Sequence, residues 1–427
     1  MQVRGALRGS GVRRAGRWAA TALAFGAGSA GCGLLLGLDE FVDAPPGSSA
    51  GGAGGGGDCA DGARDCVGDA PRVCADGAWV AQAPCDGAAP VCAAGQCVPC
   101  MEDERSCADS TPQRCEGGAW IAEAPCSGST PGCREGACVP ASCASGDPGA
   151  GPSCGPKGDQ DCCASALVPG GTFNRSNDPA YPATVSAFQM DIYEVTVGRF
   201  RAFVEAGKGT QGDPPQSGDG AHPAIPGSGW KPAWTAELTP DSAALKAALK
   251  CPSAWAWSDT AGPHERRPIN CVTWYEAFAF CSWDGGRLPT EAEWNYAAAG
   301  GEEQREYPWG GALDGTRASY GCMGDGSPAC SLEDLLPVGS KSPSGDGRWG
   351  HAEMAGNAGE LVLDYLDAAY PTPCLDCARI TGNVEVRAYR GGHAGSNDYF
   401  ISTSAQSAAD TDARSSQVGV RCARVHE

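Results

Sequence analysis

The chain has 427 residues and contains 25 Cys, 63 Gly and 32 Pro. It carries 31 Lys and Arg against 51 Asp and Glu, a net charge of −20, so we expect no nucleic-acid partner. The length favours two or three domains. The number of Cys excludes a reducing cytosol unless the thiols bind metal, because disulfides persist only in oxidising compartments.

Residues 1–31 are typical of an export signal. Five Arg precede an apolar run at residues 18–25, and small residues follow. The apolar run is too short to cross a bilayer as a helix. Residues 29–32, SAGC, resemble a bacterial lipobox, in which the Cys is acylated and becomes the new N-terminus. We expect a lipoprotein of the cell envelope, periplasmic or on the outer-membrane surface, with a lipid on Cys32; the alternative is a secreted protein with Cys32 unmodified.

The segment at residues 32–57 is predicted to be a flexible tether. Residues 43–57 read DAPPGSSAGGAGGGG and include no large apolar side chain that could offset the entropy of ordering. An interdomain linker would have the same flexibility.

Without Cys32, 24 Cys remain, 16 at positions 59–163 and 8 at positions 251–422. Both groups are even, as disulfide pairing within each region requires.

Two Cys-rich repeats follow, at residues 58–98 and 99–139. The intervals between successive Cys are 7, 8, 11, 7 and 5 in both copies, and the offset between copies is 41 residues. Cores with so few apolar residues need disulfides, and the lack of His and of paired C-x-x-C argues against zinc. We expect one disulfide connectivity in both repeats, which would form a spacer or an adhesion stalk. Residues 140–166 are a Cys-rich connector or a partial third unit.

The remainder, residues 167–427, has the pattern of an α+β domain. A strand is expected at Val168–Phe173, entered through a Gly turn, and another at Phe188–Tyr193, where apolar and polar residues alternate. A helix should begin after Thr196 as N-cap and end at Gly207.

Two further helices are marked by capping boxes. Thr273 to Glu276 and Thr290 to Glu293 both have the Thr-x-x-Glu pattern, and each is followed by apolar residues at helical spacing and a Gly pair. Beyond residue 310 the sequence predicts loops and short strands. The domain is therefore expected to be α+β with a large irregular fraction.

Several stretches of this domain resemble the sulfatase-modifying-factor family, whose founding members are formylglycine-generating enzymes. In order they are RPINCVTWYEAFAFCSWDGGRLPTEAEWNYAAAGG, YPWG, PVGS, MAGNAGE, YRGG and GVRCAR. Residues 287–294, RLPTEAEW, are the family's most recognisable run. The resemblance implies an irregular α+β fold related to C-type lectins, and it makes conversion of a sulfatase Cys to formylglycine the family activity to test.

The resemblance also implies that the oxidase chemistry is lost. Catalytic family members bind copper with two Cys after the RGG motif, since soft thiolates select Cu(I). Here RGG is residues 390–392, and Ser396 and Ile401 occupy the positions of the two Cys. We therefore expect no catalytic residue at these positions and no copper.

The groove that would hold substrate is also changed. The family has Trp at two positions of the MAGNAGE segment where this chain has Gly359 and Leu361. The candidates for groove residues are His393, Ser396 and Asn397, although a loop His that merely packs is the simpler interpretation. The ligand would be a protein, a peptide or a glycan that the sequence does not name.

A calcium ion is implied at the same segment. The resemblance matches Glu353, Gly356, Ala358 and Glu360 to calcium ligands of the family, and oxygen ligands from a tight loop suit Ca²⁺. A solvated acidic turn explains the same residues equally well.

The resemblance implies a disulfide between Cys281 and Cys422, which would tie the last strand to the helix after Thr273. The other Cys of the domain then pair most simply within short loops. The C-x-x-C spacing at residues 374–377 also occurs in redox motifs, but it follows two Pro, so we favour a structural loop disulfide. The three remaining expected pairs are Cys251–Cys271, Cys322–Cys330 and Cys374–Cys377.

Three functions remain open. The first, which we favour, is a non-catalytic binding or scaffold lipoprotein. The second is an active formylglycine-generating oxidase with relocated ligands. The third is another metal- or oxygen-dependent activity on the same fold, because function depends on the site rather than on the fold.

Overall fold

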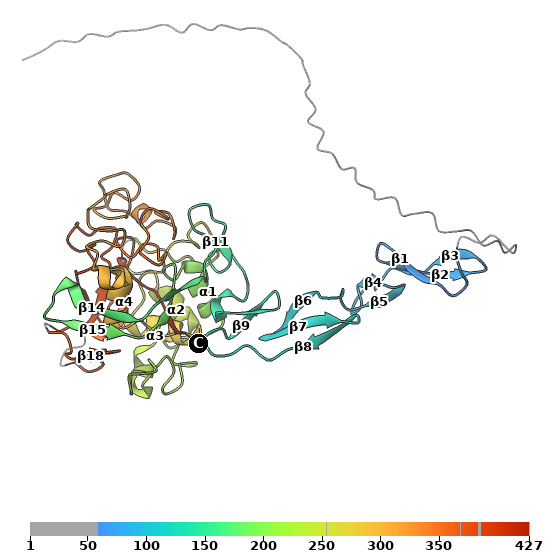
Figure 1. Cartoon of the computed structure of the whole chain (residues 1–427), viewed down its shortest axis with the longest axis horizontal. Coiled ribbons are helices and arrows are strands. Elements are labelled where there is room, and N and C mark those ends of the chain that lie inside the picture. The colour runs from blue at the N-terminus through green and yellow to red at the C-terminus, as the bar shows by residue number, and fades with distance from the viewer. Residues whose placement is uncertain (1–58, 253, 368, 383–385, 427) are drawn as a thin grey trace, which may run out of the picture. The chain divides into compact units, whose positions relative to one another are not determined.

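The computed structural model describes residues 59–252, 254–367, 369–382 and 386–426 (Figure 1). The export signal, Cys32 and the tether lie outside the described residues. No helix in the described part of the chain is long and apolar enough to cross a membrane.

The two repeats have the same strands and the same disulfides. Each contains a three-stranded antiparallel sheet followed by a two-stranded hairpin. In both, the first Cys pairs with the third, the second with the fifth and the fourth with the sixth. The strands are β1 Arg64–Val67, β2 Ala70–Ala75, β3 Ala78–Ala81, β4 Val91–Ala93 and β5 Gln96–Val98, then β6 Arg105–Ala108, β7 Thr111–Glu116, β8 Ala119–Ala122, β9 Gly132–Arg134 and β10 Ala137–Val139.

The connector is tied to the domain by buried polar contacts. Arg199 is fully buried and its guanidinium reaches Asp191 at 2.8 Å and Asp284 at 2.6 Å. Ser142 of the connector donates its backbone N–H to Asp284 and accepts a hydrogen bond from Arg199 Nε at 3.0 Å. The elements here are η1 Ala141–Cys143, β11 Pro152–Cys154 and β12 Gln160–Asp161, and the disulfides are Cys143–Cys163 and Cys154–Cys162.

Three small sheets form the β portion of the domain. Their strand orders are β13-β16-β22, β14-β15-β18 and β20-β19-β17-β21. The strand expected at 168–173 is two strands, because Pro169 and Gly170 interrupt it, and the boundary at residue 167 falls within β13. The strands are β13 Ser165–Val168, β14 Gly171–Asn174, β15 Pro182–Val185, β16 Phe188–Asp191, β17 Gly359–Tyr365, β18 Cys374–Leu375, β19 Val386–Arg390, β20 Ser407–Asp410, β21 Val418–Val420 and β22 Ala423–Val425.

Three of the four α-helices begin where the sequence predicts them. The Thr196 hydroxyl accepts the N–H of Arg199, and the capping boxes at Thr273 and Thr290 both form. The sequence analysis missed the helix that Asp241 caps. The helices are α1 Val197–Glu205, α2 Ser242–Ala248, α3 Trp274–Trp283 and α4 Glu291–Ala298, with 3-10 turns η2 Arg175–Asn177, η3 Pro232–Glu237, η4 Gly301–Glu303 and η5 Leu332–Asp334.

The main core of the domain is aromatic and lies around α1 and α3. Phe280 packs between Phe200 and Phe203, with ring centroids 5.4 and 5.5 Å away. A second cluster joins α4 to β14, β15 and β16. Cys281 and Cys422 are both fully buried in the main cluster and form a disulfide, the pair that the family resemblance implies.

The remaining Cys of the domain form the three short-loop disulfides 251–271, 322–330 and 374–377. All 24 Cys of the described residues are thus paired.

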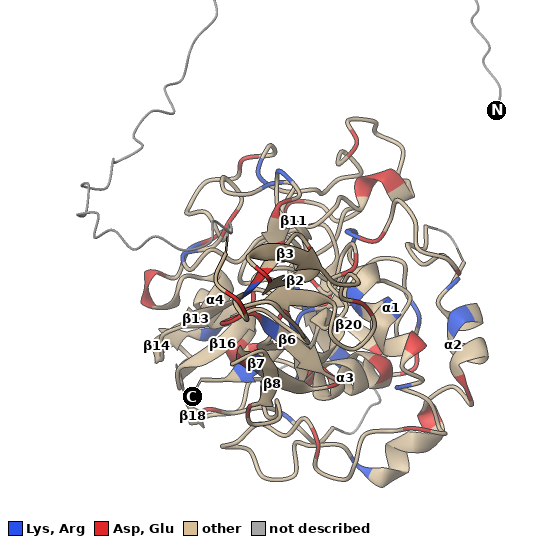
Figure 2. Cartoon of the chain, turned by 90° about the vertical axis from the view of Figure 1, so that its right-hand side faces the viewer, with Lys and Arg blue, Asp and Glu red and all other residues tan. Residues whose placement is uncertain are grey.

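Acidic positions are spread over many loops with basic positions between them (Figure 2), so the negative net charge does not gather on one element.

Candidate functional site

The loop that carries the groove candidates begins at the Gly391–Gly392 turn after β19. Both Gly have positive φ, 86° and 65°, a conformation that other residues rarely adopt. A Cβ on Gly392 would lie 2.8 Å from the carbonyl oxygen of Phe400. The two Gly therefore allow the backbone near Phe400 to fold back against the start of the loop.

Ser396 holds this loop closed. Its hydroxyl accepts the backbone N–H of His393 at 3.0 Å, and its carbonyl accepts the N–H of Gly321 at 2.8 Å. The side chain is buried. A serine in this position thus stabilises the loop conformation.

His393 is held as a neutral imidazole beside Ser396. Its Nδ1 accepts the N–H of Gly395 at 3.1 Å, so the proton belongs on Nε2. Burial lowers the pKa of His393 to about 4. Asn397 is exposed, and its side-chain oxygen accepts the N–H of Tyr399. The loop therefore offers neutral hydrogen-bonding groups at His393, Ser396 and Asn397 beside the exposed carboxylate of Asp398.

The two positions where the family resemblance implies copper-binding Cys are occupied by Ser396 and Ile401. Ile401 is fully buried in an apolar cluster with Tyr307, Ala318 and Ala355. The hydroxyl of Ser396 is a poor ligand for Cu(I), and every Cys of the described residues is in a disulfide. Soft thiolate coordination is therefore not available from the described residues in their oxidised state.

Two cavities flank His393. One, of about 160 Å³, also touches Asn357, Asp334 and Gln417. The other, of about 590 Å³, shares His393 and Gly395 with the first and is lined mainly by aromatic, neutral polar and small apolar residues. Its lining includes Tyr389, Ser396, Asn397, Phe400, Gln406 and Ser407.

The Tyr389 ring lies against Gly359, the first of the two positions where the resemblance implies a Trp. A Cβ on Gly359 would lie 2.7 Å from the Tyr389 ring, so this ring fits only beside Gly. Leu361, at the second changed position, is buried in the main core. Tyr389, which lines the larger cavity, is brought beside Gly359 by the pairing of β17 with β19.

The residues proposed to bind calcium lie among buried carboxyl groups. The Glu360 carboxylate accepts hydrogen bonds from the Arg421 guanidinium at 2.7 to 3.0 Å and from Trp294 Nε1 at 2.6 Å. Glu353 accepts the backbone N–H groups of Gly339 and Lys341 at 2.8 and 3.3 Å.

A third buried carboxylate, Glu194, accepts the N–H of Ala358 and the side-chain amide of Asn357. Burial, with Glu353 and Glu360 nearby, raises the pKa of Glu194 well above its usual range. Burial also raises the pKa of Glu353 to about 7. Three carboxylates thus lie near one guanidinium, that of Arg421, and burial favours the neutral, protonated forms of Glu194 and Glu353.

The backbone N–H of Gly356 donates to the Gly391 carbonyl, so the Glu353–Glu360 segment is joined to the RGG turn. Among the described residues, however, no group of three or more His, Cys, Asp or Glu is arranged to hold a metal ion.

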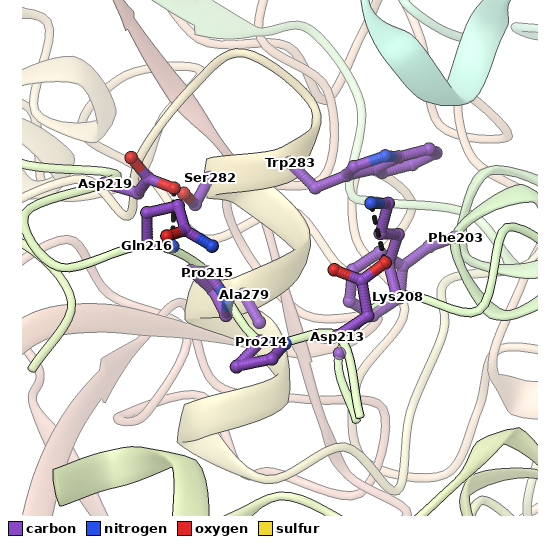
Figure 3. Close-up of a pocket in the computed structure, with 11 residues that line it drawn as sticks. Phe203, Lys208, Asp213, Pro214, Pro215, Gln216, Asp219, Ala279, Ser282 and Trp283 are labelled. Atoms are coloured by element: carbon purple, nitrogen blue, oxygen red, sulfur yellow. Dashed lines mark hydrogen bonds and ion pairs between the residues drawn. The ribbon is translucent and has the colours of Figure 1, made fainter. Parts of the chain in front are cut away.

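A further cavity, of about 150 Å³, lies between α1 and α3 (Figure 3). Trp283 and Phe203 form its apolar side, and Lys208 pairs with Asp213 at 2.8 Å. The Asp219 carboxylate accepts the N–H of Gln216. Because its charged groups are already paired, this cavity is a weaker candidate than the His393 loop.

Comparison with known proteins agrees with the residues quoted above. Residues 152–426 match the family described as the sulfatase-modifying factor enzyme 1-like domain. The formylglycine-generating enzyme of Streptomyces coelicolor is 31% identical over 273 residues, covering 57% of this chain and 80% of that protein. The inactive C-alpha-formylglycine-generating enzyme 2 of Bos taurus is 30% identical over 229 residues, covering 47% and 71%.

Among solved structures, PvdO from Pseudomonas aeruginosa aligns with a TM-score of 0.43 and 22% identity, covering 61% of this chain and 94% of that one. The family match starts at residue 152, within the segment that the sequence analysis assigned to the connector. The chain belongs to the sulfatase-modifying-factor family.

Proposed function

We propose that this chain is a non-catalytic binding member of its family, and that the surface around His393 holds the ligand. The observation that carries this proposal is that Ser396 and Ile401 stand at the two positions where catalytic family members have copper-binding Cys. Ser396 is used to close the loop and Ile401 is used in an apolar cluster. The similarity to a relative named as an inactive formylglycine-generating enzyme also supports it.

The ligand is a neutral polar chain, a peptide or glycan segment, laid across the two cavities. The lining supplies amide, hydroxyl and neutral imidazole groups beside the rings of Tyr389 and Phe400, and its one carboxylate, that of Asp334, accepts the backbone N–H groups of Gly324 and Ser331. Such groups match peptide amides or sugar hydroxyls better than they match a charged ligand. The proposal includes the lectin-related fold that the resemblance implies, in which loops hold the ligand.

Copper binding and turnover test the non-catalytic part. The full mature chain is incubated with Cu(I), dialysed, analysed for copper and then mixed with a sulfatase-motif peptide and oxygen. We expect no stoichiometric copper and an unchanged peptide Cys. Ser396→Cys/Ile401→Cys, which restores both thiols, is the matched variant and should retain copper. Copper and turnover in the native chain would overturn the proposal.

Screening the chain on peptide and glycan arrays tests the binding part. A peptide or glycan found on the arrays should bind the Asn397→Ala and Phe400→Ala variants at least tenfold more weakly than the native chain, because both side chains line the larger cavity. Lys208→Ala, in the cavity of Figure 3, is the control and should bind normally. Equal loss in all three variants would contradict a site at the His393 loop.

We further propose that the mature protein is held at the cell envelope by a lipid on Cys32. The support is the signal pattern of residues 1–32 together with a disulfide-rich chain, which suits an oxidising compartment. Mass spectrometry of the N-terminal peptide decides the matter. An unmodified Cys32 would leave a secreted protein instead.

The calcium site also remains a proposal, with a structural role. Glu353 and Glu360 would supply carboxylate oxygens and Gly356 and Ala358 backbone oxygens, and bound Ca²⁺ would offset the buried negative charge. Calcium should then raise the melting temperature by several degrees relative to EDTA, and Mg²⁺ should raise it less. Glu353→Gln should abolish the shift. An unchanged melting temperature in native protein would remove calcium from the proposal.

A further inference from the structure

The Cys374–Cys377 disulfide closes an exposed loop at a sheet edge. The strand β18, labelled beside β15 in Figure 1, contains Cys374, which pairs with Ala183 of β15. Asp376 fixes the loop, because its carboxylate accepts the N–H and hydroxyl of Ser186 at 2.6 and 2.7 Å. Leu375 at the tip is 71% exposed. The disulfide is thus presented on a rigid loop.

The two sulfurs have different surroundings. Cys374 is buried in the apolar cluster that includes Phe173 and Val185. Cys377 is only partly buried, and its Sγ lies 3.8 Å from Nη1 of Arg175. The fully buried sulfur is therefore beside apolar groups, and the more accessible one is beside a cation.

The positive charge near Cys377 is built into the core. Arg175 is 1% exposed, packs over the Tyr370 ring at 4.3 Å and donates to the Pro371 carbonyl. Glu291 lies 3.9 Å from Arg175 and also pairs with the buried Arg390. Glu291 and Asp364 are thus the carboxylates near Arg175, and Glu291 is shared with Arg390, while Cys377 Sγ lies within 3.8 Å of the Arg175 guanidinium.

We propose that Cys374–Cys377 is a redox-active pair that exchanges with the thiols of a cysteine-containing peptide or protein, with Cys377 as the exchanging sulfur. Cys377, the less buried of the two residues, has its sulfur beside a cation, and its partner Cys374 is buried among apolar groups, an arrangement that favours thiol–disulfide exchange at Cys377. The exposed Leu375 gives an apolar contact for a peptide.

The exchange balances within one turnover. A substrate thiolate attacks Sγ of Cys377, the bond to Cys374 breaks, and the Cys374 sulfur leaves and takes up a proton. The second substrate thiolate then attacks the substrate sulfur of the mixed disulfide and releases the Cys377 thiolate, which Arg175 stabilises. Two electrons pass from the substrate dithiol to the pair, and the substrate becomes a disulfide.

Equilibration in glutathione redox buffers tests whether this pair differs from the others. The full chain is held at graded ratios of reduced to oxidised glutathione, alkylated and analysed by peptide mass spectrometry. We expect 374–377 to be reduced at ratios that leave the other disulfides of the domain intact. If Cys374–Cys377 is reduced only together with those disulfides, or is not reduced at all, it is a purely structural disulfide and the proposal is overturned.

Single-Cys variants test which sulfur exchanges. Cys374→Ser leaves Cys377, and the matched control Cys322→Ser leaves Cys330, an exposed Cys of another short loop disulfide. Cys377 should form a mixed disulfide with oxidised glutathione at least tenfold faster than Cys330, and faster than the Cys374 left by Cys377→Ser. Equal rates would overturn the role of Arg175.

Two further readouts separate activity from folding. In the Cys374→Ser chain, alkylation of Cys377 should begin at lower pH than alkylation of Cys330 in its variant. The native chain should also oxidise one equivalent of a reduced two-Cys peptide, whereas Cys374→Ser/Cys377→Ser, with unchanged far-UV circular dichroism, should oxidise none. Equal oxidation by both chains would contradict the proposal.

Discussion

The Cys-rich repeats and the family domain are stabilised in opposite ways. In residues 59–139, every buried side chain larger than Gly is Cys or Pro. In the domain, the largest buried side chains include Trp230, Trp257, Trp274 and Trp294. The repeats therefore have a sulfur core and the domain has an aromatic one.

This difference shows what disulfides contribute at two chain lengths. A 41-residue repeat cannot bury enough apolar surface to offset the entropy of ordering, so its covalent links are required for folding. The domain buries continuous apolar clusters, and there Cys281–Cys422 adds to a core that already exists. Removing the same bond type should therefore have different consequences in the two regions.

The largest structural effect, unfolding of a whole unit, is expected in a repeat. Cys107→Ser/Cys133→Ser opens a link with a sequence separation of 26, worth about 3 to 4 kcal/mol by chain entropy. Because no apolar core remains, residues 99–139 should lose their protection from hydrogen exchange while the domain keeps its own. Protected amides in this repeat of the variant would show that something other than the disulfides holds it.

In the domain, the long-range disulfide is expected to matter most. Cys281→Ala/Cys422→Ala removes a link of separation 141, worth up to about 5 kcal/mol, but should leave a folded domain. Cys322→Ser/Cys330→Ser, of separation 8, should cost about half as much. Urea unfolding followed by Trp fluorescence measures both. Equal losses would mean that loop length is not the deciding factor.

Aromatic truncation should affect the two regions in the reverse order. Phe280→Ala removes a fully buried ring between two others and should lower the free energy of unfolding by about 3 to 5 kcal/mol. Trp120→Ala, at a partly exposed position of the second repeat, should cost under about 1 kcal/mol. The free energies of unfolding are measured by urea titration, with hydrogen exchange to localise the loss. A larger loss for Trp120 would refute the sulfur-core interpretation.

A smaller, pH-dependent effect is expected from the domain core alone. Burial, with Arg421 nearby, lowers the pKa of the fully buried His351 from 6.5 to about 3. Between these two pKa values the unfolded chain binds more protons at His351 than the folded chain does. The contribution of His351 to the free energy of unfolding therefore falls as pH drops, by up to about 1.4 kcal/mol per pH unit.

Asp364 and Glu353, whose pKa values burial raises to about 7, act in the opposite sense. Comparing His351→Leu with the native chain at pH 4 and pH 7 isolates the histidine. The variant should lose less free energy of unfolding on acidification than the native chain does. The same loss in both would mean that His351 does not control acid stability.

Patterns local in sequence predicted much of the structure. Thr273 and Thr290 begin helices because a capping box depends on residues three positions apart. The equal Cys intervals predicted two equivalent repeats, and the structure gives both the same connectivity. The helix at Ser242–Ala248 was missed, although Asp241 and the Ala-rich run after it carried a usable signal.

The candidate site was predicted only in part. The register after RGG identified Ser396 and Ile401 without any structure, because that comparison needs only residue types. Sequence could not show that Tyr389 covers Gly359 or that His393 lies between two cavities, since those contacts come from strands paired across the domain.

The sequence by itself determined the family, the disulfide-stapled repeats and the absence of Cys at the copper positions, since each depends on residue identity or spacing along the chain. The tertiary structure alone decided which groups meet. Arg175 and Cys377 are 202 residues apart, yet η2 and the loop after β18 bring them together. Contacts of this kind depend on how the sheets pack, because close packing fixes distances that chain spacing leaves free.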